Sequence, residues 1–122
     1  MTDLNYTFTF ENVSFGYLSR KGNITLIENF SGYFEQGEFI IIIGKNGTGK
    51  STFLKSLVKL LPLIKGKINL NERILENYSL SEYAKLISFV STSIPRTVRM
   101  TVFELVSLGR LPYTNWLGSM NK

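Results

Sequence analysis

Apolar and polar residues alternate along the first part of the chain. Between residues 6 and 17 every second side chain is aromatic or aliphatic, apart from an interruption near Glu11 and Asn12. A period of two is typical of a β-strand that buries one face. A turn-forming cluster at residues 19–23 precedes a second aromatic-rich stretch, residues 24–34, which we expect to break near Ser31 and Gly32. The pattern predicts an antiparallel β layer within residues 1–36.

A continuous apolar run occupies residues 39–43. Because it does not alternate, it predicts a strand covered on both faces within a parallel sheet. Beyond residue 49 the apolar side chains return at helical spacing, at positions Phe53, Leu54, Leu57, Val58 and Leu61. We expect this helix to run up to Pro62, because the residue before a proline is disfavoured in the α region.

Shorter elements follow. They are a strand or hairpin at residues 66–74, a helix from 79 to 86, a strand at 87–90, a polar loop at 91–100, a helix from 101 to 109 and an irregular aromatic tail at 111–117. Each helix begins with a predicted capping box, Ser79 with Glu82 and Thr101 with Glu104. The second helix carries apolar residues that we expect to face inward, namely Val102, Leu105, Val106 and Leu108. With no linker or repeat, the chain predicts one α/β domain over residues 1–122.

The junction between the apolar run and the first helix carries the chemistry. Residues 44–52 satisfy the spacing G-x-x-x-x-G-K-[ST], in which successive backbone N–H groups point inward at a polyphosphate. A strand enters the motif and a helix leaves it, so the helix adds its unpaired N–H groups and positive dipole end to the same concavity. The expected ligand is a nucleotide di- or triphosphate.

Each residue of this phosphate loop has an expected role. We expect eight of them to bind the nucleotide: Gly44, Asn46, Gly47, Thr48, Gly49, Lys50, Ser51 and Thr52. The three glycines would adopt backbone angles that a side chain resists. Lys50 would reach the β- and γ-phosphates, and the Ser51 hydroxyl would ligate Mg²⁺, a hard cation that prefers oxygen. Thr52 is expected near the α-phosphate.

The charge of the chain limits the choice of partner. With 14 Lys and Arg against 9 Asp and Glu, the net charge is +5. These basic residues are dispersed along the chain and form no stripe of the kind that nucleic-acid domains carry. Phosphate binding and solvated faces account for them, so we expect no nucleic-acid partner.

Other absences in the sequence exclude further classes of function. The chain has no Cys and no His, so it offers no disulfide framework and no imidazole base or metal ligand. No secretion signal precedes the first predicted strand, and no apolar run approaches the roughly 18 residues of a membrane span. We therefore expect a cytoplasmic protein.

Together these features resemble the ATP-binding subunit of an ABC transporter, and the chain corresponds to the N-terminal part of such a subunit. The resemblance implies an incomplete P-loop NTPase fold of the ABC ATPase type, with an antiparallel β layer and part of a parallel core sheet with its helices. Phe15, Gly16 and Tyr17 look like the family's aromatic loop, in which Tyr17 would stack on the adenine of ATP. The alternative is that Tyr17 is an ordinary strand aromatic. The Asn-Lys-x-Asp guanine reader of GTPases is missing, which favours ATP.

Residues 101–113 are similar to a segment of ATPases that serve iron-siderophore, haem and cobalamin importers. In that subgroup the segment faces the membrane subunit. The resemblance therefore implies that transmembrane permease subunits contact the chain between Pro95 and Tyr113, with the protein peripheral on the inner face of the membrane. It also implies a second copy of the ATPase subunit. The alternative for the segment is a capped surface helix without a partner.

The chain departs from the family pattern in two ways. Thr92 stands near the position of the family's loop glutamine, and we do not assign it a catalytic role. The signature motif, the water-activating Glu and the switch His are absent from residues 1–122, so we expect no catalytic residue and no hydrolysis by this chain alone. We also expect an unpaired edge at residues 39–43 and hence a marginal fold. The alternatives are a non-catalytic nucleotide-binding fragment and an ABC ATPase that is not linked to transport.

Overall fold

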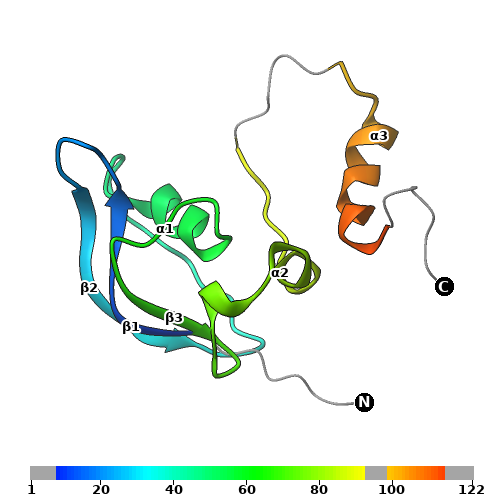
Figure 1. Cartoon of the computed structure of the whole chain (residues 1–122). Coiled ribbons are helices and arrows are strands. Elements are labelled where there is room, and N and C mark those ends of the chain that lie inside the picture. Colours follow the sequence, from blue (N-terminus) through cyan, green and yellow to red (C-terminus); the bar gives the residue numbers. More distant parts are fainter. Residues whose placement is uncertain (1–7, 93–98, 115–122) are drawn as a thin grey trace. The chain divides into compact units, whose positions relative to one another are not determined.

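The structure is a computed structural model that describes residues 8–92 and 99–114. The chain divides into two compact units, residues 1–78 and residues 79–122. Figure 1 shows the sheet and helix α1 (Lys50–Leu57) in the first unit, and helices α2 (Leu80–Leu86) and α3 (Val102–Ser107) in the second.

The first unit is built on a four-stranded antiparallel sheet. Its strands are β1 (Phe8–Tyr17), β2 (Ile24–Phe34), β3 (Lys65–Leu70) and β4 (Arg73–Ile74), in the spatial order β2-β1-β3-β4. The predicted antiparallel layer is therefore confirmed for its described part, and the predicted hairpin at residues 66–74 supplies its other two strands. Asn71 and Glu72 form the tight turn between β3 and β4, both with positive φ, as a two-residue hairpin requires.

The interruption predicted near Glu11 and Asn12 is a β-bulge. Phe10 pairs with Gly32 and Val13 with Phe30, so β1 holds one more residue than β2 between these pairs. Asn12 has a φ of 48°, and its backbone N–H donates to the Ser31 hydroxyl at 2.9 Å. The break expected in β2 at residues 31 and 32 was wrong, because the strand continues through them and the bulge fastens to Ser31.

Helix α1 (Lys50–Leu57) packs on the sheet through a cluster of phenylalanines. Its Phe53 ring lies 4.8 Å from Phe15, 5.7 Å from Phe30 and 5.8 Å from Phe10, measured between ring centroids. Phe34 completes the cluster at 6.2 Å from Phe53. Several of these pairs are edge-to-face, an arrangement that adds to the stabilisation from burial alone. The cluster attaches the helix that follows the phosphate loop to strands β1 and β2.

Helix α1 ends at Leu57, earlier than the predicted stop at Pro62. Lys59 takes a left-handed φ of 59° and its N–H donates to the Ser56 carbonyl, while the Leu60 N–H donates to the Lys55 carbonyl at 2.8 Å. This is a Schellman motif, which satisfies the last carbonyls of a helix. Lys59 Nζ also donates to the carbonyls of Leu75 and Tyr78, which holds the turn to the segment after β4. These contacts end the helix at Leu57, although apolar residues continue at helical spacing as far as Leu61.

The predicted parallel core strands were wrong for the described residues. Residues 39–43 and 87–90 belong to no strand, and Phe39 and Ile43 are 90% and 89% exposed. An apolar run becomes a strand only where a neighbouring strand supplies hydrogen-bond partners. Within the described part of the chain no such neighbour pairs with either segment.

The second unit contains helix α2 (Leu80–Leu86), helix α3 (Val102–Ser107) and the 3₁₀ helix η2 (Leu108–Tyr113). Both predicted capping boxes are confirmed, and the hydrogen bonds from Thr101 hold the pKa of Glu104 below its usual value. Helix α3 ends at Ser107 instead of residue 109, because the chain tightens directly into η2. The tail is thus helical up to Tyr113, and its residues 115–117 lie outside the described residues. The Tyr113 hydroxyl donates to the Lys85 carbonyl at 3.4 Å, which ties η2 to α2.

Four apolar residues in or next to helix α3 were expected to face inward, but they are exposed. They are Val102, Leu105, Val106 and Leu108. The described residues provide no element that covers this face. The expectation was wrong because helical spacing shows which residues share a face and not whether a partner covers that face.

Gly16 sits where the sheet has no room for a side chain. A Cβ at this position would lie 1.9 Å from the Ile24 carbonyl oxygen and 2.7 Å from Ile64 Cδ1. Gly16 is buried and immediately precedes Tyr17 at the end of β1. The close approach of β2 at this point therefore sets where Tyr17 emerges from the sheet.

We predict that Gly16→Ala lowers the free energy of unfolding by about 1–3 kcal/mol or more, because the new Cβ would clash with the backbone of Ile24 in β2. About 1–3 kcal/mol is the usual cost of overpacking. Thermal unfolding followed by circular dichroism measures the change. Gly32→Ala is the matched control, since a Cβ there would meet only Phe30 Cζ at 3.8 Å, an ordinary contact. Equal melting temperatures for the two variants would contradict the packing described here.

Candidate functional site

The phosphate loop is held by hydrogen bonds within itself. The Lys45 carbonyl accepts from the Thr48 N–H at 3.4 Å, from Thr48 Oγ1 at 2.8 Å and from Lys50 Nζ at 2.7 Å. Lys50 Nζ also donates to the Gly44 carbonyl at 2.7 Å. The ammonium group therefore bridges two carbonyl groups of the loop.

The phosphate loop leads directly into helix α1, and no side chain caps the N-terminus of this helix. Gly49 is the N-cap residue, so no side chain accepts from the first N–H groups, and the first turn has no acidic residue. Such a helix end combines unsatisfied N–H groups with a positive partial charge, which favours an anion. The sequence predicted this arrangement from the strand-to-helix position of the motif, although the entering segment is not a strand.

The expectation for the three loop glycines holds for two of them. Gly47 and Gly49 have φ values of 84° and 98°, which side chains resist, whereas Gly44 does not have a positive φ. The constraint at Gly44 is space, because a Cβ would lie 3.0 Å from Thr48 Oγ1. At Gly49 both constraints act, since a Cβ would also lie 3.0 Å from Leu26 Cβ.

One cavity of about 410 Å³ brings Tyr17 together with most of the loop. Its lining residues are Tyr17, Leu26, Asn46, Gly47, Gly49, Lys50, Ser51 and Thr52. The Tyr17 hydroxyl forms a hydrogen bond with Thr52 Oγ1 at 3.1 Å. We call this cavity the loop pocket. Tyr17 is half-exposed and lies beside the phosphate loop, as its predicted role requires.

The remaining two predicted residues lie elsewhere. Gly44 and Thr48 line a neighbouring apolar groove of about 550 Å³, together with Phe53 and the residues 40–43. Thr48 directs its hydroxyl at the Lys45 carbonyl, so its side chain serves the loop itself. Lys50 lines both the groove and the loop pocket, and it contacts Gly44 through its hydrogen bond to the Gly44 carbonyl.

Sequence reasoning missed Leu26. Leu26 lies in β2 and lines the loop pocket together with Tyr17 and Gly49. No motif marks it, because its place depends on how closely β2 approaches the start of α1. The only sequence signal is its membership of the strand next to β1.

The residues of the loop pocket fit a nucleotide polyphosphate with Mg²⁺. Space left by missing side chains at Gly47 and Gly49, the Lys50 ammonium and the exposed Ser51 suit phosphate oxygens and a hard cation. No Asp or Glu lines the loop pocket. In the described ranges no group of three or more Asp or Glu residues could hold a metal ion.

Other predicted contacts fall partly outside the described residues. Of the stretch that was predicted to contact a permease, residues 95–98 lie outside the described residues, and Arg99 to Tyr113 are described in the second unit. Thr92 lies in an exposed bend of that unit. Among the residues that the structure describes, no helix combines the length and apolar character that crossing a membrane would need.

Comparison with protein families gives one match that covers most of the chain. The model of the family described as ABC transporter matches residues 27–121. This range contains the phosphate loop and both capped helices of the second unit. It begins after Tyr17, so the match does not extend to the aromatic residue of the loop pocket.

Individual relatives are similar over nearly the whole chain. The chain is 37% identical over 109 residues to the achromobactin transport ATP-binding protein CbrD of Dickeya dadantii, covering 89% of this chain and 39% of that protein. It is 34% identical over 112 residues to the probable siderophore transport system ATP-binding protein YusV of Bacillus subtilis, covering 92% of this chain and 39% of that protein. The chain therefore spans about two fifths of the length of these relatives.

A solved structure shares the fold. A bacterial Atm1-family ABC exporter with ATP bound superposes on 65% of this chain and 13% of its own, with a TM-score of 0.57 and 25% sequence identity.

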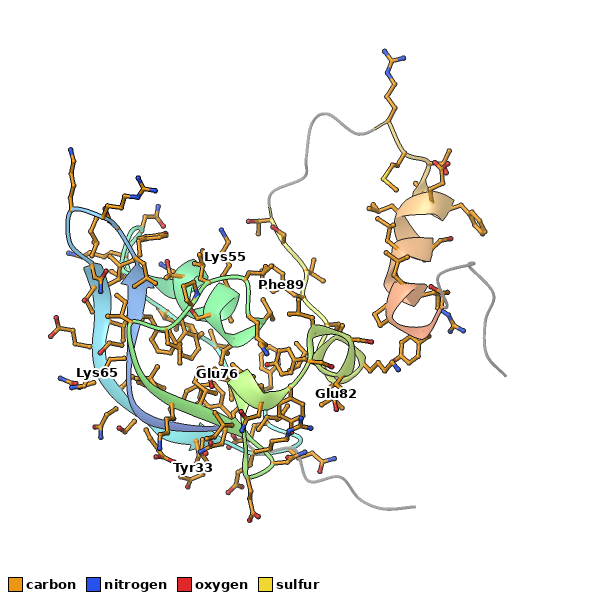
Figure 2. The ribbon with its side chains drawn as sticks, viewed as in Figure 1. Tyr33, Lys55, Lys65, Glu76, Glu82 and Phe89 are labelled. Carbon is orange, nitrogen blue, oxygen red and sulfur yellow. The ribbon has the colours of Figure 1, made fainter. Side chains whose placement is uncertain are left out.

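We predict that Lys50→Ala weakens Mg·ATP binding by at least about tenfold, because each hydrogen bond to a charged group contributes about 1.5–3 kcal/mol. Isothermal titration calorimetry measures the affinity. Lys55→Ala is the matched control, since it removes the same charge from the same helix at an exposed position on its far side from the sheet (Figure 2). Unchanged affinity in Lys50→Ala would place the ligand outside the loop pocket.

Proposed function

The chain belongs to the ABC transporter family, and from that membership we propose that it is the N-terminal part of an ATP-binding subunit that energises import of iron complexes. The observation that carries the proposal is the loop pocket, in which one cavity is lined by both Tyr17 and the phosphate loop. A base platform and a polyphosphate cradle side by side are what a nucleotide requires. The loop without Tyr17 would support only a phosphate site.

Each group of the loop pocket has a proposed role in binding Mg·ATP. The N–H groups from Gly47 to Ser51 and the Lys50 ammonium would hold the phosphates. The Ser51 hydroxyl would ligate Mg²⁺, and Tyr17 would stack on the adenine. Lys50 would exchange its bonds to the loop carbonyls of Gly44 and Lys45 for bonds to phosphate oxygens.

Hydrolysis belongs to the intact protein in this proposal. The loop pocket has no carboxylate that could orient an attacking water. The described residues therefore bind and position the nucleotide, and the water-orienting group would come from other parts of the intact subunit and from a second copy. The same observation favours a second candidate, a non-catalytic nucleotide-binding chain, which would bind Mg·ATP without ever releasing phosphate.

The substrate class rests on the relatives. The names of CbrD and YusV describe transport of achromobactin and a siderophore transport system. The sequence from Thr101 to Tyr113 is similar to ATPases that serve iron-siderophore, haem and cobalamin importers, which also favours iron complexes. Cobalamin stays an alternative substrate. The transported compound would be selected by the membrane subunits rather than by the loop pocket.

The contact with the membrane subunits is proposed for the apolar face of α3. Val102 and Phe103 are 80% and 81% exposed, and Val106 lies one turn further along the helix. An exposed group of large apolar side chains is typical of a surface that another protein covers. This contact would place the protein at the inner face of the membrane, on the cytoplasmic side.

The proposal predicts that cells need the protein to import iron complexes. Deleting the gene from its host should abolish uptake of at least one ferric siderophore, haem or cobalamin, measured with labelled compounds. Restoring the complete protein should restore uptake, and the Lys55→Ala variant should restore it equally. The Lys50→Ala variant should not, because the nucleotide would no longer bind.

Uptake of the whole panel that is unaffected by the deletion would overturn the import proposal. Phosphate release from Mg·ATP by the purified complete protein separates the two candidates. Binding without release would favour the non-catalytic chain.

A further inference from the structure

We infer that Thr52 is a positioning residue for Tyr17, and that their hydrogen bond couples the base platform to the phosphate loop. The inference rests on the proposed function of the loop pocket. It concerns how this pocket is organised before a nucleotide enters. It also gives Thr52 a role beyond its expected place near the α-phosphate.

The two hydroxyl groups come from buried surroundings on one side and an exposed surface on the other. Thr52 is 3% exposed and belongs to the first turn of α1, next to Phe53 in the phenylalanine cluster. Tyr17 is the last residue of β1, is 47% exposed and precedes the exposed turn at residues 18–23. The 3.1 Å hydrogen bond therefore ties a half-exposed ring to a fixed point of the helix.

The bond reduces the cost of ordering the ring for a ligand. An aromatic platform that must be immobilised when a base binds loses part of the stacking energy to that ordering. With its hydroxyl held by Thr52, the Tyr17 ring is restrained before binding. Phenylalanine at this position could still stack but could not be held in this way.

The chemistry of the Thr52 hydroxyl allows the bond to persist when a phosphate is present. A hydroxyl group has one proton to donate and lone pairs to accept. Thr52 Oγ1 can accept the phenolic proton of Tyr17 and still donate its own proton to a phosphate oxygen, which can only accept. The two contacts are therefore compatible.

A double-mutant cycle tests the coupling. Tyr17→Phe should weaken Mg·ATP binding by about two- to tenfold, the usual effect of one hydrogen bond. With Thr52→Val already present, Tyr17→Phe should have no further effect. Isothermal titration calorimetry with Mg·ATP on the four proteins gives the coupling directly.

Inorganic tripolyphosphate separates positioning of the ring from damage to the loop. Tyr17→Phe should leave tripolyphosphate affinity unchanged, because this ligand has no base to stack. A general structural defect would lower the affinity for both tripolyphosphate and Mg·ATP. Thr52→Ser keeps the hydroxyl, so Tyr17→Phe should regain its effect on Mg·ATP in that background.

Tyr33→Phe is the control for loss of a phenolic hydroxyl. Tyr33 lies on β2 with its side chain exposed at the outer part of the sheet (Figure 2), so both affinities should match the wild-type values. An equal effect of Tyr17→Phe with and without Thr52→Val, or no effect at all, would overturn the coupling alone. Failure of the wild-type chain to bind Mg·ATP would instead overturn the proposed function.

Discussion

The packing of Phe53 against the phenylalanines of β1 and β2 is the interaction on which the site depends. The first unit has a single layer of strands, and α1 is attached to it mainly through this ring. Full burial of a phenylalanine contributes about 1.5–3 kcal/mol, a large share of the stability of a small unit. Phe53 follows Thr52 in the sequence, so the ring that fixes the helix also fixes the hydroxyl beside Tyr17.

This arrangement explains how residues distant in the sequence form one pocket. Gly16 lets β2 approach the end of β1, and Gly49 lets the start of α1 approach Leu26 of β2. At Gly16 a Cβ would lie 1.9 Å from the Ile24 carbonyl oxygen, and at Gly49 it would lie 3.0 Å from Leu26 Cβ and would strain a backbone with a φ of 98°. Tyr17 and the phosphate loop therefore meet because two glycines permit close contact and one aromatic ring holds the result.

Features set by neighbouring residues could be predicted from the sequence, and features set by distant partners could not. The capping boxes at Ser79 and Thr101 depend on a few adjacent side chains, and the structure confirms them. The sequence also predicted an interruption near Asn12, but that it is a bulge fastened to Ser31 of β2 required the pairing of the strands to be known. Residues 39–43 could not be assigned correctly, because a strand needs a neighbour that the described part of the chain does not supply. The phosphate loop was evident from its spacing, whereas the role of Leu26 required the approach of β2 to be known. The prediction that the apolar face of α3 is buried was wrong for the same reason, because burial also needs a partner that the described part of the chain does not supply.

The proposed nucleotide site requires the backbone between Gly47 and Thr52 to contact the ligand. Amide hydrogen exchange of the folded chain, with and without saturating Mg·ATP, measures that contact. We expect slower exchange at these amides, with little change in β3, which does not line the loop pocket. Exchange at residues 47–52 that stays the same with Mg·ATP present would contradict it.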